Sequence, residues 1–295
     1  MPQMKSFFLL LGTSTLAQVH ARHLPPRDVD ATIPKDGLVP VFFDDFCGTP
    51  GSLPDESNWL FSLGTRYPGG APNWGNNEFQ SYTKSPNNIH ITKNNTLAIV
   101  PRLRDGNWTS ARLETQDTSF VAEAGGRLLI EASIKLGDAP LDQQQGIWPA
   151  FWALGQKFRG NYTYWPMATE WDFMEAVSGQ STMYSTIHCA YAPGGPCNEY
   201  QGLGNNGAPF SRGVFHTVGF MADRSMTGPS KNGTWRDETL NWYLDGTKVF
   251  NVTGATIGDE AVWALLAHQG PPNNATVGGP SVGMEVDYIG VYASA

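Results

Sequence analysis

The chain has 295 residues and a formal net charge of −8 at pH 7, and only 16% of its residues are charged. This balance offers no basic surface stripe, and it therefore excludes nucleic acid and anionic membranes as partners. The 33 Gly, 21 Pro, 10 Trp and 10 Tyr favour many short strands joined by turns. They also suit a neutral partner such as a sugar, which aromatic faces and hydrogen bonds hold.

The N-terminal residues predict an export signal. Lys5 precedes the apolar run 7–11, and small residues suited to cleavage follow it. The run is too short to span a membrane, and no later window offers about 18 unbroken apolar residues. We therefore expect a signal peptide at 1–21, a flexible, polar leader at 22–37 and a single domain at 38–295.

Six Asn-x-Ser/Thr sequons accompany this signal. On a eukaryotic export route they would lie in surface turns and carry glycans. The chain is therefore expected to be secreted, and to be extracellular or associated with a cell wall. No hydrophobic tail predicts a glycolipid anchor. The sequon asparagines are Asn94, Asn107, Asn161, Asn232, Asn251 and Asn274.

Short strand-like runs recur between turn signals along the domain. Residues 88–92 and 127–136 alternate apolar and polar side chains, which is the period of a half-buried antiparallel strand. Asp245 and Gly246, between two such runs, predict a hairpin turn. With no sustained helical period, the pattern predicts an all-β jelly-roll sandwich of two antiparallel sheets. The runs span 39–46, 88–103, 127–136, 170–177, 182–191, 216–222, 240–252 and 283–293.

The chain has three cysteines, an odd number for an oxidising compartment. Cys189 and Cys197 are close enough in sequence to bridge a loop, and we expect that disulfide. Cys47 is then left over. We expect it to be a buried thiol that packs like a small hydrophobe; the alternative is a partner that competes for one of the other two. Zinc is not expected, because no Cys-x-x-Cys or clustered histidines accompany them.

The segment 170–175, Glu-Trp-Asp-Phe-Met-Glu, carries the strongest chemical signal. On a regular strand Glu170 and Asp172 share a face, and Glu175 points to the other. A β-bulge at Phe173 or Met174 would return Glu175 to the first face, and bulges are frequent beside active sites. Clustered carboxylates make a poor core, so they form either a solvated edge or a catalytic group. Two carboxylates about 5 to 5.5 Å apart are the equipment of a retaining glycosidase.

Further motifs surround this segment, in the order FDDFCG (43–48), WGNNEFQSYT (74–83), TSARLET (109–115), GIWPAFWALG (146–155), EWDFMEAVSG (170–179) and MEVDYIGVY (284–292). Together they resemble glycoside hydrolase family 16, of the laminarinase or β-glucanase type. The resemblance covers nearly the whole domain and keeps the family's order. It favours the catalytic interpretation of the acids over a solvated edge.

The resemblance implies a concanavalin A-like jelly roll whose concave sheet forms a long glycan cleft, so that 38–295 is a catalytic domain. It implies Glu170 as nucleophile, Asp172 as assisting acid and Glu175 as acid/base. In similar enzymes the residue that matches Trp148 lies near the cut site, and the one that matches His188 lies close to the acid/base. No cofactor is required.

Tryptophans are candidates for sugar stacking. Trp148 offers a flat apolar face for a pyranose ring, and Trp165 is a second candidate. Trp152 is expected to pack in the core instead, because tryptophan in a sheet is more often packing than platform. Trp171 is likewise a candidate either for sugar stacking or for packing in the core.

Polar side chains are also candidates for the substrate site. Asn77, Glu78 and Arg112 have hydrogen-bonding groups suited to sugar hydroxyls, although a structural Arg–Glu pair is an equally good account. A neutral His188 would orient Glu175 or a sugar hydroxyl, and a merely packed histidine is the rival interpretation.

One departure concerns FHTVGFMADR (215–224), where many β-1,3-glucan hydrolases of the family read like FHTYAIEW. Phe220 and Met221 replace a Glu-Trp pair, which predicts the loss of a sugar-stacking tryptophan and leaves the sugar open. Asp287 sits where some relatives bind structural calcium, but the sequence offers no dense cage of oxygen ligands and the metal stays unassigned.

The leading hypothesis is a secreted, monomeric, retaining endo-glycosidase that cuts β-1,3-glucan or mixed β-1,3/1,4-glucan. The alternatives are an endo-β-1,3-galactanase, a cell-wall transglycosylase that uses the same glutamates, and a non-catalytic glycan-binding protein on the same scaffold.

Overall fold

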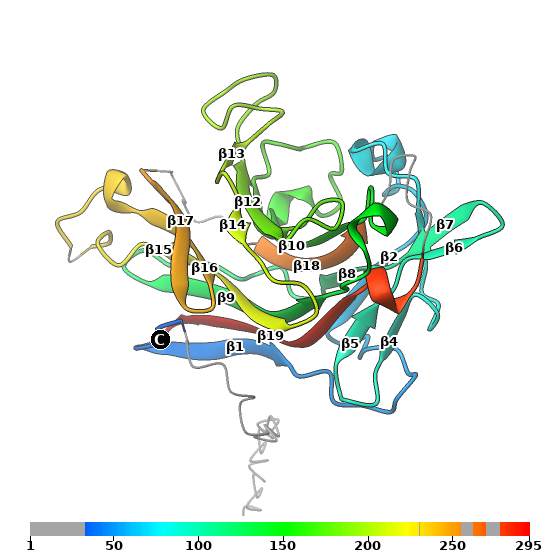
Figure 1. Ribbon diagram of the computed structural model, residues 1–295. Helices are drawn as coiled ribbons and strands as arrows, with labels where there is room; N and C mark the ends of the chain where they lie inside the picture. Colours follow the sequence, from blue (N-terminus) through cyan, green and yellow to red (C-terminus); the bar gives the residue numbers. More distant parts are fainter. Residues whose placement is uncertain (1–32, 230, 255–261, 270–277) are drawn as a thin grey trace, which may run out of the picture.

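The computed structural model describes residues 33–229, 231–254, 262–269 and 278–295. Two antiparallel sheets stack on each other, with β9 and β19 in one and β10 and β18 in the other (Figure 1). This confirms the predicted all-β sandwich. In the described part of the chain, no helix is long and apolar enough to cross a membrane.

The first sheet, called here the outer sheet, runs in the order β17-β16-β15-β9-β19-β5-β4, with β1 paired to β19. Every neighbouring pair is antiparallel, as hairpin-connected strands require. Its strands are β1 (Leu38–Asp44), β4 (Ile89–Ile91), β5 (Leu97–Ile99), β9 (Arg127–Leu136), β15 (Phe215–Asp223), β16 (Thr239–Leu244), β17 (Thr247–Thr253) and β19 (Met284–Ser294).

The second sheet, called here the acid sheet because it carries the three acids, runs in the order β13-β12-β11-β10-β18-β8-β2, with β14 paired to β12. Its strands are β2 (Trp59–Ser62), β8 (Arg112–Thr115), β10 (Trp148–Gly155), β11 (Glu170–Glu175), β12 (Thr182–His188), β13 (Leu203–Gly204), β14 (Ala208–Pro209) and β18 (Val262–Gln269).

A small third sheet and short 3-10 helices complete the structure. The small sheet joins β3 (Ser81–Tyr82), β6 (Arg102–Arg104) and β7 (Asn107–Ser110), with β3 parallel to β7. The 3-10 helices are η1 (Pro72–Gly75), η2 (Leu141–Gln143), η3 (Gln156–Phe158), η4 (Trp235–Asp237) and η5 (Pro280–Val282).

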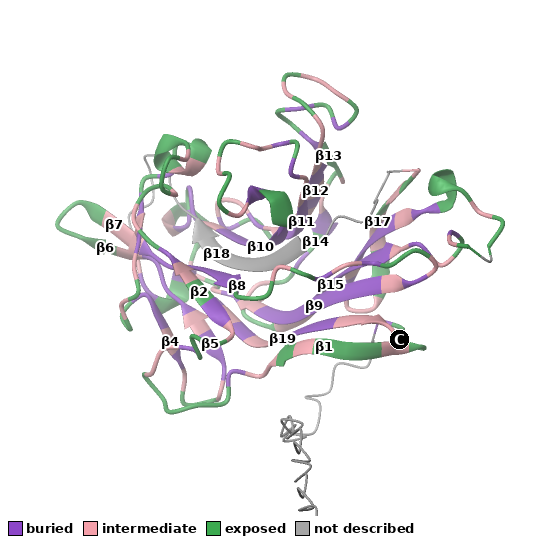
Figure 2. Cartoon of the chain, turned by 180° about the vertical axis from the view of Figure 1, so that it is seen from behind, coloured by how far each residue is buried: buried purple, intermediate pink, exposed green. Residues whose placement is uncertain are grey.

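The main core lies between the two sheets. On β9 the even residues from Leu128 to Leu136 point into it, and Trp171 and Phe173 of β11 meet them from the acid sheet. Strand β9 is buried along most of its length, so odd residues such as Leu129 are covered too (Figure 2). The outer face of the outer sheet is therefore not solvent-exposed at its centre.

Residues 33–37 provide part of that cover, which corrects the prediction of a flexible leader up to 37. Ile33 is buried against Leu129 and Met221, and Lys35 Nζ lies 2.6 Å from the buried Glu131 carboxylate. Gly219 makes room for this segment, because a Cβ there would lie 2.0 Å from Ile33 Cδ1. The predicted signal peptide and the rest of the leader lie outside the described residues.

Strand β15 corrects the inference drawn from Phe220 and Met221. Phe220 is fully buried between the sheets, 4.9 Å from Trp171 and 4.8 Å from Phe173 between ring centroids. Met221 points to the opposite face of the outer sheet, where it contacts Ile33. Neither side chain lies on the face that carries the acids, so their identity does not mark a lost sugar-stacking residue.

The structure confirms two of the predictions for the cysteines and the hairpin turn and corrects a third. The predicted Cys189–Cys197 disulfide is present. Cys47 is a free, exposed thiol rather than the buried one expected, because the neighbouring Phe46 takes the core position instead. The predicted turn at Asp245-Gly246 joins β16 to β17 with positive φ at both residues, as a type I′ hairpin requires.

Five of the six predicted glycosylation asparagines lie in described segments, and each of the five is exposed. They therefore remain accessible to a glycan. Asn274 lies outside the described residues. The exposed asparagines are Asn94, Asn107, Asn161, Asn232 and Asn251.

Candidate active site

A β-bulge in β11 brings the acids to one face. Ala150 of β10 pairs with Glu175, Phe151 with Met174 and Trp152 already with Asp172, so Phe173 is the extra residue. The same shift separates Asp172 from Glu175 in the pairing with β12. This confirms the bulge predicted from the sequence. It returns Glu175 to the side of the earlier acids.

The bulge also explains why this local sequence is stable as a strand. Trp171, Phe173 and Met174 all enter the main core, whereas Glu170 and Glu175 stay partly exposed on the opposite face. The apolar residues therefore anchor β11 from behind. The carboxylates are presented on a rigid strand rather than on a loop.

Two tryptophans donate hydrogen bonds to the outer acids. Trp148 Nε1 donates to Glu175 Oε1 at 2.9 Å, and Trp165 Nε1 donates to Glu170 Oε2 at 2.7 Å. Both indoles are partly exposed, so each combines a fixed polar edge with an accessible ring. The structure thus places both predicted sugar-binding tryptophans in the site, one beside each glutamate.

Asp172 lies between the two glutamates and is nearly fully buried. Burial, together with the charges of Glu170 and Glu175 and a hydrogen bond to Glu170, raises the pKa of Asp172 well above its ordinary value. This rise in pKa favours the protonated form of Asp172, which donates a hydrogen bond to Glu170. A protonated middle acid lowers the repulsion among three carboxyl groups.

The two glutamates differ in their surroundings. Burial and the charge of Glu170 raise the pKa of Glu175 to about 7, against one hydrogen bond from Trp148 and the charge of His188. Burial also raises the pKa of Glu170, but the charge of His188 and the hydrogen bonds from Trp165 and Asp172 oppose this rise. Glu170 is thus the better stabilised anion, and Glu175 is poised to exchange a proton near neutral pH.

His188 lies beside the nucleophile candidate rather than beside the acid/base candidate. It pairs with Glu170 across β11 and β12, and its Nε2 is 3.6 Å from Asp172 Oδ2. Its Nδ1 lies 2.8 Å from Glu199 Oε2. His188 was predicted to orient Glu175 or a sugar hydroxyl. The structure instead places it against Asp172 and beside Glu170.

Arg112 and Glu78 are buried, which favours the structural alternative over direct contact with a sugar. The Arg112 guanidinium lies over the rings of Trp74 and Trp152, 4.7 Å and 4.6 Å from their centroids. Glu78 accepts hydrogen bonds from Gln80 and Tyr82. Register places Arg112 on the same face of the acid sheet as the acids, because Arg112 aligns with Ala267 and Ala150, and Ala150 pairs with Glu175.

Asn77 differs from these two, because it is exposed on a loop with φ at 57°. It remains a candidate for contact with substrate. Trp152 is nearly buried over Arg112, in a cluster separate from the main core, and it shares the face of the acids because it pairs with Asp172. Trp171 belongs to the main core.

Sequence reasoning missed Glu199 and Tyr200. Glu199 is buried and partners His188, and the ring of Tyr200 stacks 6.3 Å from that of Trp165 while staying 62% exposed. Both residues belong to the Gly- and Pro-rich loop that contains the disulfide. The paired cysteines mark that loop, but nothing in its composition shows which side chain turns back to the site.

Glu170, Asp172 and His188 also form a group with metal-ligand chemistry. One ligand atom from each lies within 4.8 Å of the others. Each already has a partner from the protein, because Trp165 binds Glu170, Glu170 binds Asp172 and Glu199 binds His188. These contacts account for the cluster through proton sharing, and no metal role is assigned to it.

The fold and the site together define the class: a β-jelly-roll O-glycosyl hydrolase. No protein-family model matches the chain. A solved structure of an endo-1,3-beta-glucanase from Streptomyces sioyaensis is 38% identical to it, with a TM-score of 0.80 and coverage of 90% of this chain and 99% of that one.

Two further relatives agree. An endo-beta-1,3-glucanase structure from Pyrococcus furiosus is 28% identical, with a TM-score of 0.67 and coverage of 88% of this chain and 95% of that one. A beta-glucanase from Rhodothermus marinus is 27% identical over an alignment of 276 positions, with coverage of 85% of this chain and 84% of that one. The chain belongs to glycoside hydrolase family 16, among its laminarinase-type β-glucanases.

Proposed function

We propose that the chain is a retaining endo-hydrolase of β-1,3-glucan, with Glu170 as nucleophile and Glu175 as acid/base. One observation carries the proposal: the bulge at Phe173 brings both glutamates and Asp172 to one face of β11. A binding protein has no need of an acid and a nucleophile that differ in their proton affinity. The glucanase names of the relatives support the substrate class.

In the first step the Glu170 carboxylate attacks the anomeric carbon of the sugar. The bond to the leaving glycosidic oxygen breaks, and the proton on Glu175 passes to that oxygen. A glycosyl ester on Glu170 results. The proton that Asp172 shares with Glu170 keeps the nucleophile hydrogen-bonded while its charge changes.

In the second step Glu175, now a carboxylate, takes a proton from water. The water oxygen attacks the anomeric carbon, and the ester bond to Glu170 breaks. Two inversions leave the product with the β configuration. The pKa of Glu175, about 7, suits a group that must first donate and then accept a proton.

The two site tryptophans suit a chain of sugar rings that runs across β11. Trp148 and Trp165 each present an accessible indole beside one glutamate. The face of an aromatic ring packs against the apolar C–H face of a pyranose ring. Mixed β-1,3/1,4-glucan is a second substrate in this proposal, supported by a 24% identical endo-1,3-1,4-beta-glycanase from Rhizobium meliloti.

We also propose that the enzyme is secreted and glycosylated, because the signal-like N-terminus, the exposed sequons and the disulfide all suit an exported chain. The chemistry uses protein side chains and water, and requires no cofactor.

The test is a product profile of the purified protein on laminarin, lichenan, β-1,3-galactan and xyloglucan. We expect oligosaccharides from laminarin, and from lichenan as second substrate. The variants Glu170→Gln and Glu175→Gln keep the side-chain shape and should each lose at least about a thousandfold in kcat.

Other outcomes of this profile each overturn part of the proposal. Products from galactan alone would replace the substrate, and longer chains in place of shorter ones would indicate sugar transfer. Binding without products from any glycan would remove the catalytic role. Near-normal turnover by either variant would remove that glutamate from its role.

A further inference from the structure

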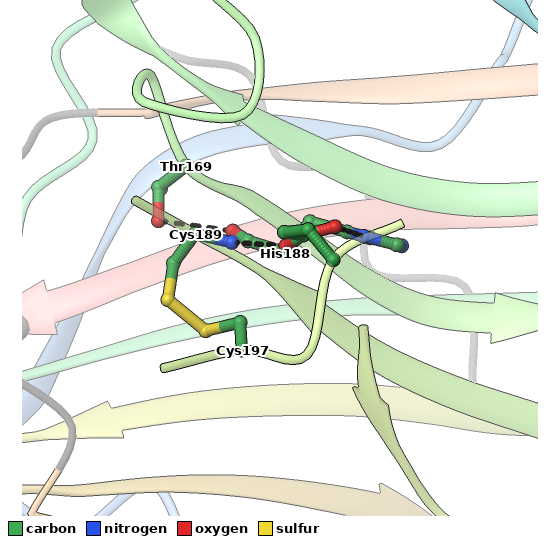
Figure 3. The surroundings of a disulfide bond; sticks show 5 residues. Thr169, His188, Cys189 and Cys197 are labelled. Carbon is green, nitrogen blue, oxygen red and sulfur yellow. Dashed lines mark hydrogen bonds and ion pairs between the residues drawn. A yellow bond between two sulfur atoms is a disulfide. The ribbon is translucent and has the colours of Figure 1, made fainter. Parts of the chain in front are cut away.

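The loop after β12 turns a buried carboxylate back onto the site. It starts at Cys189, is closed by the disulfide to Cys197, and returns to the sheet at β13. Glu199 lies on the returning arm and is 3% exposed. Figure 3 shows His188 next to this disulfide, with the hydrogen bonds around it.

Both oxygens of Glu199 are engaged. Oε1 accepts a hydrogen bond from the Cys189 backbone N–H at 2.7 Å, and Oε2 lies 2.8 Å from His188 Nδ1. The first contact fixes the carboxylate to the base of its own loop. The second joins it to the imidazole that faces Asp172.

The return of the loop is tight against His188. Gly202 has φ at +76°, and a Cβ there would lie 2.4 Å from Thr186 Cγ2 and 2.9 Å from His188 Cε1. A side chain at 202 would therefore push the returning arm off β12. Glycine at this position and the disulfide at the other end hold Glu199 against the imidazole.

The geometry decides which ring nitrogen of His188 carries a proton. A carboxylate only accepts hydrogen bonds, so Nδ1 must donate to Glu199 Oε2. Nε2 is then the nitrogen directed at Asp172 Oδ2, 3.6 Å away. Without Glu199 the ring loses this hydrogen bond, which fixes its orientation.

We propose that Glu199 is a positioning residue for the reaction: it fixes the proton and orientation of His188, and through His188 it holds Asp172 and Glu170 in place. This inference rests on the proposed glucan hydrolysis. Glu199 itself is buried and is not assigned to the substrate. Its loss should therefore lower kcat and leave KM nearly unchanged.

The variant Glu199→Gln tests this directly. A glutamine that keeps its oxygen on the Cys189 N–H must turn its NH2 group toward His188, so Nδ1 becomes an acceptor. In ¹⁵N NMR of the disulfide-bonded protein we expect a protonated His188 Nδ1 in the wild type and an unprotonated one in the variant. The variant His188→Gln lacks this signal and therefore assigns it. On laminarin, kcat should fall roughly tenfold with KM within about twofold.

The matched control is Gln201→Ala, an exposed position on the same loop. It should keep the wild-type NMR signal and wild-type kcat. An unchanged Nδ1 signal in Glu199→Gln, or a kcat within about twofold of the wild type, overturns the proposal. An unprotonated His188 Nδ1 in the wild type also overturns the proposal. This second test does not depend on whether the variant folds.

The NMR result is independent of the substrate. If the wild type does not cut laminarin, the proposed function fails while the Nδ1 measurement still decides how Glu199 and His188 are arranged. If laminarin is cut and Nδ1 is unprotonated, the positioning role fails and the proposed function stands.

Discussion

At the scale of single residues, the two glutamates are chemically alike in the sequence and unlike in the structure. Glu170 receives hydrogen bonds from Trp165 and Asp172, whereas Glu175 receives one from Trp148. That asymmetry favours the anion at Glu170 and a proton at Glu175. The acids themselves were readable from the sequence, but their donors were not. Trp148 lies 27 positions before Glu175, and Trp165 lies five positions before Glu170 in the segment between β10 and β11. Neither spacing reveals the hydrogen bond. 

The hydrogen bond from Trp148 lowers the pKa of Glu175, because it stabilises the carboxylate form. The general acid must be protonated in the free enzyme, so activity is lost as pH rises through this pKa, about 7. In Trp148→Phe we expect the pKa to rise and the alkaline limb of the kcat/KM profile to move up by roughly half a unit to one unit.

The matched control is Trp165→Phe, which removes the donor to Glu170 instead. It should leave the alkaline limb in place and move the acid limb upward, since the nucleophile must be ionised. An alkaline limb that stays or moves down in Trp148→Phe contradicts the assignment of Glu175 as general acid.

At the scale of elements, the strands and the bulge were predictable, and the burial of particular polar side chains was not. Alternation identified β9, and the Asp-Gly pair identified the β16–β17 turn. The bulge was predictable because three acids on one strand make physical sense only on a single face. Arg112 and Glu78 suited both sugar binding and a structural role, and the structure buries both. The ring of Trp74 covers Arg112, and Tyr82, four residues further on, donates a hydrogen bond to Glu78.

The disulfide stabilises the loop that carries Glu199. It links cysteines eight positions apart, so replacing both with serine should cost about 2 to 3 kcal/mol of unfolding free energy by loss of the loop constraint. For a chain of this size the expected fall in Tm is about 5 °C. Thermal unfolding of the Cys189→Ser/Cys197→Ser variant measures it.

The free Cys47 provides the control for that measurement. It is exposed and outside the loop, so Cys47→Ser should leave Tm within about 1 °C of the wild type. An unchanged Tm in the double variant would mean that hydrogen bonds alone fix the loop.

At the scale of the whole molecule, two sheets enclose the main core, and the acid sheet carries the three acids on its other face. The jelly roll and the family were predictable, because the strand period and the motifs extend over nearly the whole domain. The segment 33–37 was not, since a polar, proline-bearing stretch gives no sign that Ile33 fits over Gly219 on the outer sheet. The inference of a lost sugar-stacking tryptophan at Phe220 and Met221 was wrong for a related reason. The sequence does not show which sheet a strand joins.

The proposed double displacement by Glu170 and Glu175 determines the configuration of the product. Proton NMR of laminarin during the first minutes of hydrolysis records the anomeric configuration of the new reducing end before mutarotation. We expect the β anomer to form first. An α anomer formed first would contradict the covalent intermediate on Glu170.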